Sequence, residues 1–286
     1  MKKARRWLLA AALAALLCLC LLDALPRHGR TAASEHGNGL FSWHADAMEA
    51  GRQEDLFSLM KELGLTELYQ HIPHTAQREA VRKFLRAAEE EGITVYMLTG
   101  DPAWGLDSSG RAMTEEISRA AGYGGLRGVM MDVEPYLTAE WQDDPDSAME
   151  RYVQAMTAAK EAADAGGQEL VACIPYFYES LGQEERLETL VNRGCHAVAV
   201  MNYDKQDEAD NLENEAAFAK AYGKPLLTIY ELQPPGTQDL TDRNTYYNDG
   251  LDALAESWAR LERRYGDMRF SYALHEYEAL KEVLGD

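Results

Sequence analysis

The chain has 286 residues, of which 46% are hydrophobic, and this is enough for one large core in a single domain. It carries 48 Asp and Glu residues against 28 Lys and Arg residues, a formal net charge of −20. A surface of that sign repels phosphate backbones, which excludes nucleic-acid binding as the expected function.

Residues 1–33 form a leader that differs in kind from the rest of the chain. Basic residues precede an uncharged apolar run, Trp7–Leu22, as in a secretory signal peptide or an N-terminal membrane anchor. The run is shorter than the roughly 20 residues that span a bilayer, which favours a signal peptide. The basic stretch from Arg27 to Arg30 argues against cleavage, so both alternatives stay open. Either one predicts a protein outside the cytoplasmic membrane, secreted or tethered to it.

From residue 34 to residue 286, short apolar runs alternate with amphipathic segments, which indicates βα units around a parallel sheet. The expected strands are Gly39–His44, Glu67–Ile72, Ile93–Gly100, Gly128–Glu134, Glu169–Tyr178, His196–Asp204, Pro225–Leu232 and Met268–Tyr277. Helical patterns lie near 50–63, 76–91, 112–121, 146–165, 183–193, 207–222, 245–265 and 277–284. Eight strands, each followed by a helix, predict one α/β domain over 34–286, a single (β/α)8 TIM barrel.

The expected fourth strand ends in two carboxylates, Asp132 and Glu134, followed by Pro135. Side chains alternate between the faces of a strand, so both acids project from the same side. A buried carboxylate without a partner costs several kcal/mol, which makes a catalytic pair a better explanation than a structural one. We expect Glu134 to be a general acid whose pKa is raised by burial and by the charge of Asp132.

Polar and aromatic residues gather at the other strand ends, where the loops of a barrel form its catalytic face. Aromatic rings stack on the C–H faces of sugars, and polar side chains hydrogen-bond sugar hydroxyls, so this mixture predicts a carbohydrate cleft. The predicted substrate-binding residues are Trp43, His44, Gln70, Trp104, Tyr176, Asn202, Asp204 and His275.

The sequence contains no Gly-rich phosphate loop, Walker motif or His-x-x-x-His pair, so we expect neither a cofactor nor a metal ion. A metal site made of His44, His71 and His275 together with Asp132 is not expected, because these histidines come from separate strands. Outside the leader, Cys173 and Cys195 are expected to be buried free thiols rather than a disulfide. No sequence signal sets an oligomeric state.

Two stretches resemble glycoside hydrolase family 18, the chitinase-like barrels. Asp132-Val133-Glu134 is similar to the end of that family's D-x-x-D-x-D-x-E pattern, and Met201-Asn202-Tyr203-Asp204 matches its M-x-Y-D pattern. The resemblance implies that Glu134 is the acid, that Asp132 orients the acetamido group of the substrate, and that Tyr203 helps to hold it. The chain departs from the family at Arg127 and Met130, which replace the two earlier acids.

A second resemblance is to the clan A retaining glycosidases. Glu134-Pro135 is similar to their N-E-P acid/base motif, with Val133 in place of Asn, and Glu231 on the seventh strand would then be the nucleophile. The sequence therefore predicts an extracytoplasmic glycoside hydrolase-like barrel that acts on a polysaccharide or cell-surface glycan. The alternatives are a clan A-like retaining enzyme that uses Glu231, and a carbohydrate-binding barrel without turnover.

Overall fold

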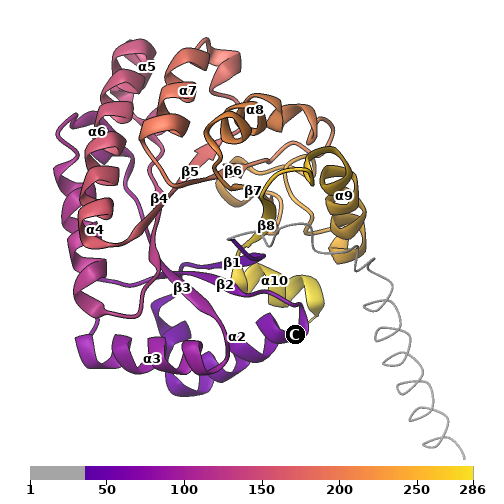
Figure 1. Ribbon diagram of the computed structural model, residues 1–286. Helices are drawn as coiled ribbons and strands as arrows, with labels where there is room; N and C mark the ends of the chain where they lie inside the picture. The colour runs from indigo at the N-terminus through magenta and orange to yellow at the C-terminus, as the bar shows by residue number, and fades with distance from the viewer. Residues whose placement is uncertain (1–35, 286) are drawn as a thin grey trace, which may run out of the picture. The chain divides into compact units, whose positions relative to one another are not determined.

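Eight parallel strands close into a barrel in chain order (Figure 1). The structure, a computed structural model, describes residues 36–285, so the predicted leader at 1–33 lies outside the described residues. Pairing of Leu40 with Leu274 joins the first strand to the last. The strands are β1 Gly39–Ser42, β2 Glu67–His71, β3 Thr94–Thr99, β4 Gly128–Asp132, β5 Glu169–Pro175, β6 Ala197–Met201, β7 Leu226–Glu231 and β8 Phe270–His275. The predicted (β/α)8 barrel is confirmed.

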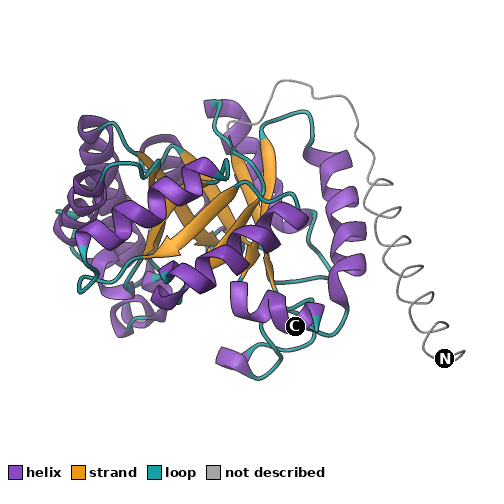
Figure 2. Ribbon diagram, turned by 90° about the horizontal axis from the view of Figure 1, so that it is seen from below, coloured by secondary structure: helices purple, strands orange, loops and turns teal. Residues whose placement is uncertain are grey.

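Helices surround the strands on the outside of the barrel (Figure 2). Within residues 36–285 they are α2 Ala50–Glu62, α3 Arg78–Glu90, α4 Arg111–Tyr123, α5 Ala139–Asp143, α6 Pro145–Gly166, α7 Glu184–Arg193, α8 Glu213–Tyr222, α9 Gly250–Tyr265 and α10 Tyr277–Leu284. The short helix α5 lies between the predicted fourth strand and the helical pattern near 146–165, where the sequence did not predict a helix. None of the helices in this part of the chain is both long and apolar enough to cross a membrane.

The ends of α6 illustrate how local sequence sets the helix bounds. Asp144 precedes Pro145, and its Oδ1 accepts a hydrogen bond from the backbone N–H of Ser147 at 3.0 Å. A capping carboxylate and a proline at the first helical position are both typical of a helix start. Gly167 then adopts a left-handed φ of 64°, which ends the helix and turns the chain toward β5.

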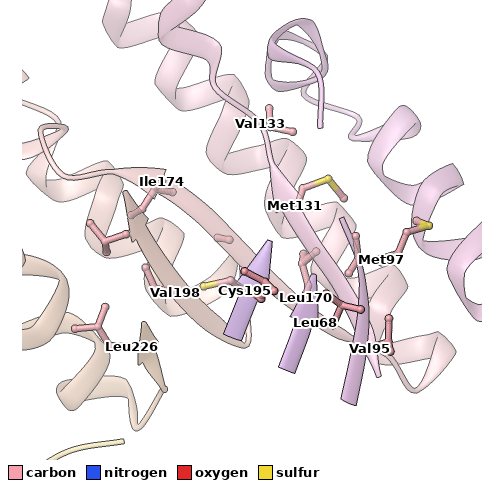
Figure 3. Packing of buried hydrophobic residues seen from close by; sticks show 14 of the residues in the cluster. Leu68, Val95, Met97, Met131, Val133, Leu170, Ile174, Cys195, Val198 and Leu226 are labelled. Carbon is pink, nitrogen blue, oxygen red and sulfur yellow. The ribbon is translucent and has the colours of Figure 1, made fainter. Parts of the chain in front are cut away.

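The main core lies between the strands and the helices. Figure 3 shows Val95, Met97, Met131, Val133 and other labelled side chains of this cluster around the strands. Cys195 belongs to it, whereas Cys173 lies in the barrel interior. Both thiols are free and buried, as predicted.

The barrel interior is filled by a second, smaller cluster with an uneven distribution of side-chain size. Large rings come from β1, β2 and β3, namely Phe41, Tyr69 and Tyr96, and small side chains come from β6 and β8, namely Ala197, Ala199 and Ala273. Gly39 makes room for the Tyr69 ring, since a Cβ at that position would lie 2.6 Å from a ring carbon. The interior is therefore a packed core rather than a pore.

Glu67 organises the amino-terminal end of the barrel. Its carboxylate accepts hydrogen bonds from His36 Nδ1 at 3.0 Å, from the backbone N–H of Gly37 at 3.0 Å and from the Tyr69 hydroxyl at 2.8 Å. Glu67 is buried, so these donors supply the partners that a carboxylate out of water requires. This network holds the start of the described chain against the end of the barrel where the strands begin.

Candidate active site

A cavity of about 920 Å³ opens at the carboxyl ends of the strands. All strands except β2 contribute to the lining of this cavity, either directly or through the loop that follows them. The lining includes Trp43, Pro102, Asp132, Cys173, Tyr203, Glu231 and His275. A smaller hollow of about 440 Å³, beside α2 and α3, is mostly apolar and contains no pair of facing acids. The larger cavity is the candidate active site.

Strand alternation brings the two predicted acids into this cavity. Met130 lies in the interior cluster and Met131 and Val133 lie in the outer core, so Asp132 and Glu134 both face inward. Oδ1 of Asp132 is buried and has no hydrogen-bond partner among residues 36–285. The position is therefore open to a ligand group that can donate a hydrogen bond.

The electrostatics of the pair act most strongly on Asp132. Burial, reinforced by the charge of Glu134, raises the pKa of Asp132 to about 7, while the thiol of Cys173 and the nearby His275 oppose the rise. The carboxyl pair thus includes a group whose pKa is raised by burial and by a neighbouring acid, and that group is Asp132. Asp132 can thus gain or lose a proton near neutral pH.

Tyr136 fixes the carboxyl group of Glu134, and the sequence did not identify it. Its hydroxyl donates a hydrogen bond to Glu134 Oε2, and its ring packs edge-on against Phe177 with a centroid distance of 5.1 Å. Burial and the charge of Glu134 raise the pKa of Tyr136 far above its ordinary value, so the hydroxyl stays protonated. Tyr136 lies two residues after Glu134 in the short helix η3 (Pro135–Leu137), beyond the end of the strand, so the period-two rule could not place it.

Glu231, His275 and Trp43 form a hydrogen-bonded chain along one side of the cavity. Glu231 Oε2 lies 2.9 Å from His275 Nδ1, and the indole Nε1 of Trp43 lies 3.1 Å from His275 Nε2. An indole N–H can only donate, so Nε2 must be the acceptor and Nδ1 must carry the proton donated to Glu231. The geometry therefore defines a neutral His275 with its proton on Nδ1. Burial lowers the pKa of His275 and the Glu231 carboxylate raises it, and the net result is a pKa above the ordinary value. The N–H of Trp43 points at Nε2 and opposes a proton on that nitrogen.

Tyr203 presents an unused hydroxyl to the cavity. Its ring centroid lies 6.4 Å from that of His275, and its hydroxyl forms no hydrogen bond with the described part of the chain. Burial, followed by the charge of Glu231, raises the pKa of Tyr203 well above its ordinary value. The protonated hydroxyl is thus available to a ligand.

The structure brings eight of the twelve predicted site residues to the cavity. They are Trp43, His44, Asp132, Glu134, Tyr176, Tyr203, Glu231 and His275. The other four, Gln70, Trp104, Asn202 and Asp204, are not in its lining.

The same strand alternation explains two of these four. Met201 and Tyr203 line the cavity, so Asn202 and Asp204 between and after them turn away from it. Asn202 Nδ2 donates to the carbonyl of Glu208 at 2.8 Å. Asp204 accepts from Arg243 Nε at 2.7 Å, and this guanidinium holds the pKa of Asp204 below its ordinary value. Both side chains anchor the loops that follow β6 and β7.

Gln70 and Trp104 have structural contacts instead. The Gln70 amide donates to the backbone carbonyls of His44 and His71 at 3.0 and 2.9 Å, which ties the end of β1 to the end of β2. Trp104 lies in the short helix η2 (Pro102–Leu106) and packs against the outer core.

The loop between β7 and α9 adds lining residues that were not among the predicted site residues. This loop supplies Gln233, Gln238, Asp239, Leu240 and Asn244 to the lining, and Asn244 Nδ2 donates to the backbone carbonyl of Tyr203 at 2.7 Å. A long break after a strand was the available signal, since such loops lie on the catalytic face. Also missed were the lining residues Phe41, Gly100, Pro102, Leu137, Cys173, Pro175, Phe177, Met201 and Glu276.

Among residues 36–285, no three or more His, Cys, Asp or Glu side chains are grouped so that they could hold a metal ion. What the cavity offers is a carboxyl pair, a protonated tyrosine hydroxyl and aromatic walls. These groups can donate and accept protons and can stack on a ring. This defines the class of the protein as a (β/α)8 barrel, the fold that glycoside hydrolases use, with a polar and aromatic site at the carboxyl ends of its strands.

Comparison with known proteins shows which solved structures share this fold. No family model matches the sequence, and no curated protein matches it either. A family 18 chitinase from Cycas revoluta, solved in complex with (GlcNAc)4, superposes with a TM-score of 0.55 at 13% identity, covering 86% of this chain and 97% of that one. A chitinase from Chromobacterium violaceum gives 0.52 at 14% identity, with 87% and 98% covered. D-psicose 3-epimerase from Clostridium cellulolyticum, solved with D-tagatose, gives 0.53 at 13% identity, with 83% and 84% covered. The resemblance to chitinase-like barrels is thus confirmed at the level of the fold.

Proposed function

We propose that the protein is a glycoside hydrolase that acts outside the cytoplasmic membrane on a polysaccharide or cell-surface glycan. The observation that carries the proposal is the pair Asp132 and Glu134, which face the same 920 Å³ cavity from the end of β4. Aromatic residues from β1, β5 and β6 surround this pair, as a sugar-binding cleft requires. That two of the solved barrels with this fold are chitinases supports the same substrate class.

In the proposed reaction Glu134 gives its proton to the leaving oxygen as the glycosidic C–O bond breaks. In an N-acetylated substrate, the acetamido oxygen of the sugar that loses its leaving group attacks the anomeric carbon of that sugar. Water then opens the cyclic intermediate, and Glu134 takes a proton from this water. The open Oδ1 of Asp132 can accept a hydrogen bond from the acetamido N–H, and the free Tyr203 hydroxyl can bind its oxygen. This assignment uses the open Oδ1 of Asp132 and the Tyr203 hydroxyl, which both face the cavity.

The clan A alternative, with Glu231 as nucleophile, is less well supported. Glu231 Oε1 accepts from the backbone N–H groups of Leu232 and Gln233 at 3.0 and 2.8 Å, and Oε2 is paired with His275. An attacking carboxylate would have to leave at least one of these partners. The route in which the acetamido oxygen of the substrate is the nucleophile leaves all these contacts of Glu231 in place.

The test compares Glu134→Gln with the wild type on two substrates. Loss of a positioned general acid costs about 10²- to 10⁴-fold in rate, so a glycoside with a poor leaving group should lose that much. An aryl glycoside with a good leaving group should lose less, because its leaving oxygen needs little protonation. Glu140→Gln, an equivalent change at an exposed residue of α5 outside the cavity lining, is the control and should leave both rates unchanged.

Equal and small losses on both substrates would remove Glu134 from this role. If the wild type binds oligosaccharides and cleaves none, the protein is the non-catalytic carbohydrate-binding barrel instead. The location is tested separately by fractionating cells that express the full-length chain. A soluble cytoplasmic pool would refute the extracytoplasmic assignment that rests on Trp7–Leu22.

A further inference from the structure

The chain of hydrogen bonds from Glu231 through His275 to Trp43 has a use that general acid catalysis does not explain. We propose that Glu231 and His275 are positioning residues, which fix the Trp43 indole as the platform for the apolar face of a sugar ring. The inference rests on the proposed function for the identity of the ligand, and it assigns Glu231 a role in binding rather than in bond breaking. His275 is the last residue of β8 and Trp43 follows β1, so the contact also joins the two strands that close the barrel.

Glu231 has the surroundings of a fixed anchor. Its exposed fraction is 3%, and its two oxygens accept from two backbone N–H groups and one imidazole nitrogen. Both backbone donors belong to the residues immediately after Glu231, so the carboxylate cannot rotate without losing them. A buried carboxylate held in this way acts as a fixed acceptor for the next group in the chain.

This fixed acceptor determines which nitrogen of His275 carries the proton. With Nδ1–H directed at Glu231, Nε2 has a free lone pair and can accept from Trp43. The imidazole ring is also held by Phe41, edge-on at 5.4 Å. Because Glu231 accepts from Nδ1–H, Nε2 of His275 remains an acceptor for the N–H of the Trp43 indole.

Two contacts then define the orientation of the indole. Its N–H edge is bound to His275, and its ring centroid lies 5.9 Å from that of His71 at an angle of 35°. Trp43 also lines the cavity that contains Asp132 and Glu134. An aromatic ring whose plane is already fixed beside the two acids provides a stacking surface for a ligand. Binding then costs no further side-chain conformational entropy at this ring.

The substitution Glu231→Gln tests the proposal with little change in volume. A Gln that keeps its oxygen toward the two backbone N–H groups turns its amide N–H toward His275 Nδ1, which must then accept. The proton moves to Nε2, where it opposes the Trp43 N–H, and the platform is released. In the flipped orientation the amide N–H groups meet the backbone N–H groups instead, so one set of contacts is lost in either case.

The readouts are steady-state kinetics on an oligosaccharide and the ¹⁵N–¹H resonance of the Trp43 indole, identified by its absence from Trp43→Phe. We expect Glu231→Gln to raise KM about tenfold, to change kcat less than about threefold, and to shift the indole resonance. Trp43→Phe should raise KM by a similar factor, and the double variant should be no worse than either single one, since all three remove the same contact. Trp104→Phe, a change to an indole outside the cavity lining, is the control and should leave KM unchanged.

Three results would overturn the proposal. An unshifted Trp43 resonance in Glu231→Gln would mean that Glu231 does not set the indole. Additive effects in the double variant would mean that the two residues act separately. A fall in kcat of more than about 10³-fold with unchanged KM would make Glu231 a participant in bond breaking. If the wild type instead cleaves no glycoside while the resonance shifts as expected, the positioning chain stands and only the hydrolase assignment fails.

Discussion

Asp132→Asn should stabilise the folded protein, and the gain should depend on pH. The change removes the charge of a carboxyl group that lies in the cavity with a buried, unpartnered Oδ1, and it keeps nearly the same volume. Burial and the charge of Glu134 raise the pKa of Asp132 from an ordinary 3.8 to about 7. Ionisation of Asp132 is therefore harder in the folded state than in the unfolded state.

The size of the effect follows from the difference between these two pKa values. Each pKa unit is worth about 1.4 kcal/mol, so ionised Asp132 costs the folded state about 4 kcal/mol at most. Below pH 3.8 the carboxyl is protonated in both states and contributes no penalty. As the pH rises from there toward 7, the unfolded state loses its proton first and the free energy of unfolding of the wild type falls. Above about pH 7 the penalty is complete.

The assay is urea denaturation of wild type and Asp132→Asn at several values from about pH 4 to about pH 8. The difference in free energy of unfolding should grow in favour of the variant across this range, by up to about 4 kcal/mol. Glu140→Gln, at an exposed position, should show no such trend. A difference that is the same at both ends of the range would show that the folded protein does not hold a proton on Asp132, and would refute the electrostatic assignment.

Three further substitutions test other parts of the molecule. Tyr203→Phe should lower kcat/KM on N-acetylated substrates by about two- to tenfold, because it removes a hydroxyl available to the acetamido group; unchanged activity would favour the clan A alternative. Glu215→Gln in α8 should raise the free energy of unfolding at neutral pH by about 1–3 kcal/mol, since both carboxylate oxygens are fully buried without partners and burial raises the pKa of Glu215. That gain should vanish in acid, where the carboxyl is protonated in both states, and a gain that persists there would contradict it. Glu67→Gln should lower the free energy of unfolding by about 1–3 kcal/mol in urea denaturation, because an amide cannot accept from all three of its donors without presenting an N–H to one of them; an unchanged midpoint would show that the network adds no stability.

The barrel could be predicted because each of its signals is local. Most strands are short, largely apolar runs that are buried on both sides, and most helices end at a glycine, so the alternation is visible without any knowledge of contacts. The same period-two rule correctly placed Asp132 and Glu134 together. Applied strictly to the sixth strand, it would also have separated Tyr203, which lines the cavity, from Asn202 and Asp204, which do not.

The rest of the site depends on distances between segments far apart in the sequence. The bond between Trp43 and His275 joins residues 232 positions apart, and no pattern in the sequence indicates which nitrogen of His275 the indole meets. The pKa of Asp132 likewise depends on neighbours from other strands, since Cys173 and His275 oppose the rise that burial and the charge of Glu134 cause. Charge, spacing and residue type predicted the two acids, but the raised pKa of Asp132 depends on its burial in the packed barrel.

The uneven filling of the barrel interior constrains how its sequence can vary. Phe41, Tyr69 and Tyr96 project large rings into the interior from three adjacent strands, and alanines at 197, 199 and 273 leave room for these rings. A larger residue at one of the alanine positions must be matched by a smaller ring in the same cluster, because close-packed interiors tolerate extra atoms poorly. These positions are thus coupled in size although they lie far apart in the sequence. Laboratory variants that reshape the floor beneath Asp132 will have to exchange volume across the barrel in complementary pairs.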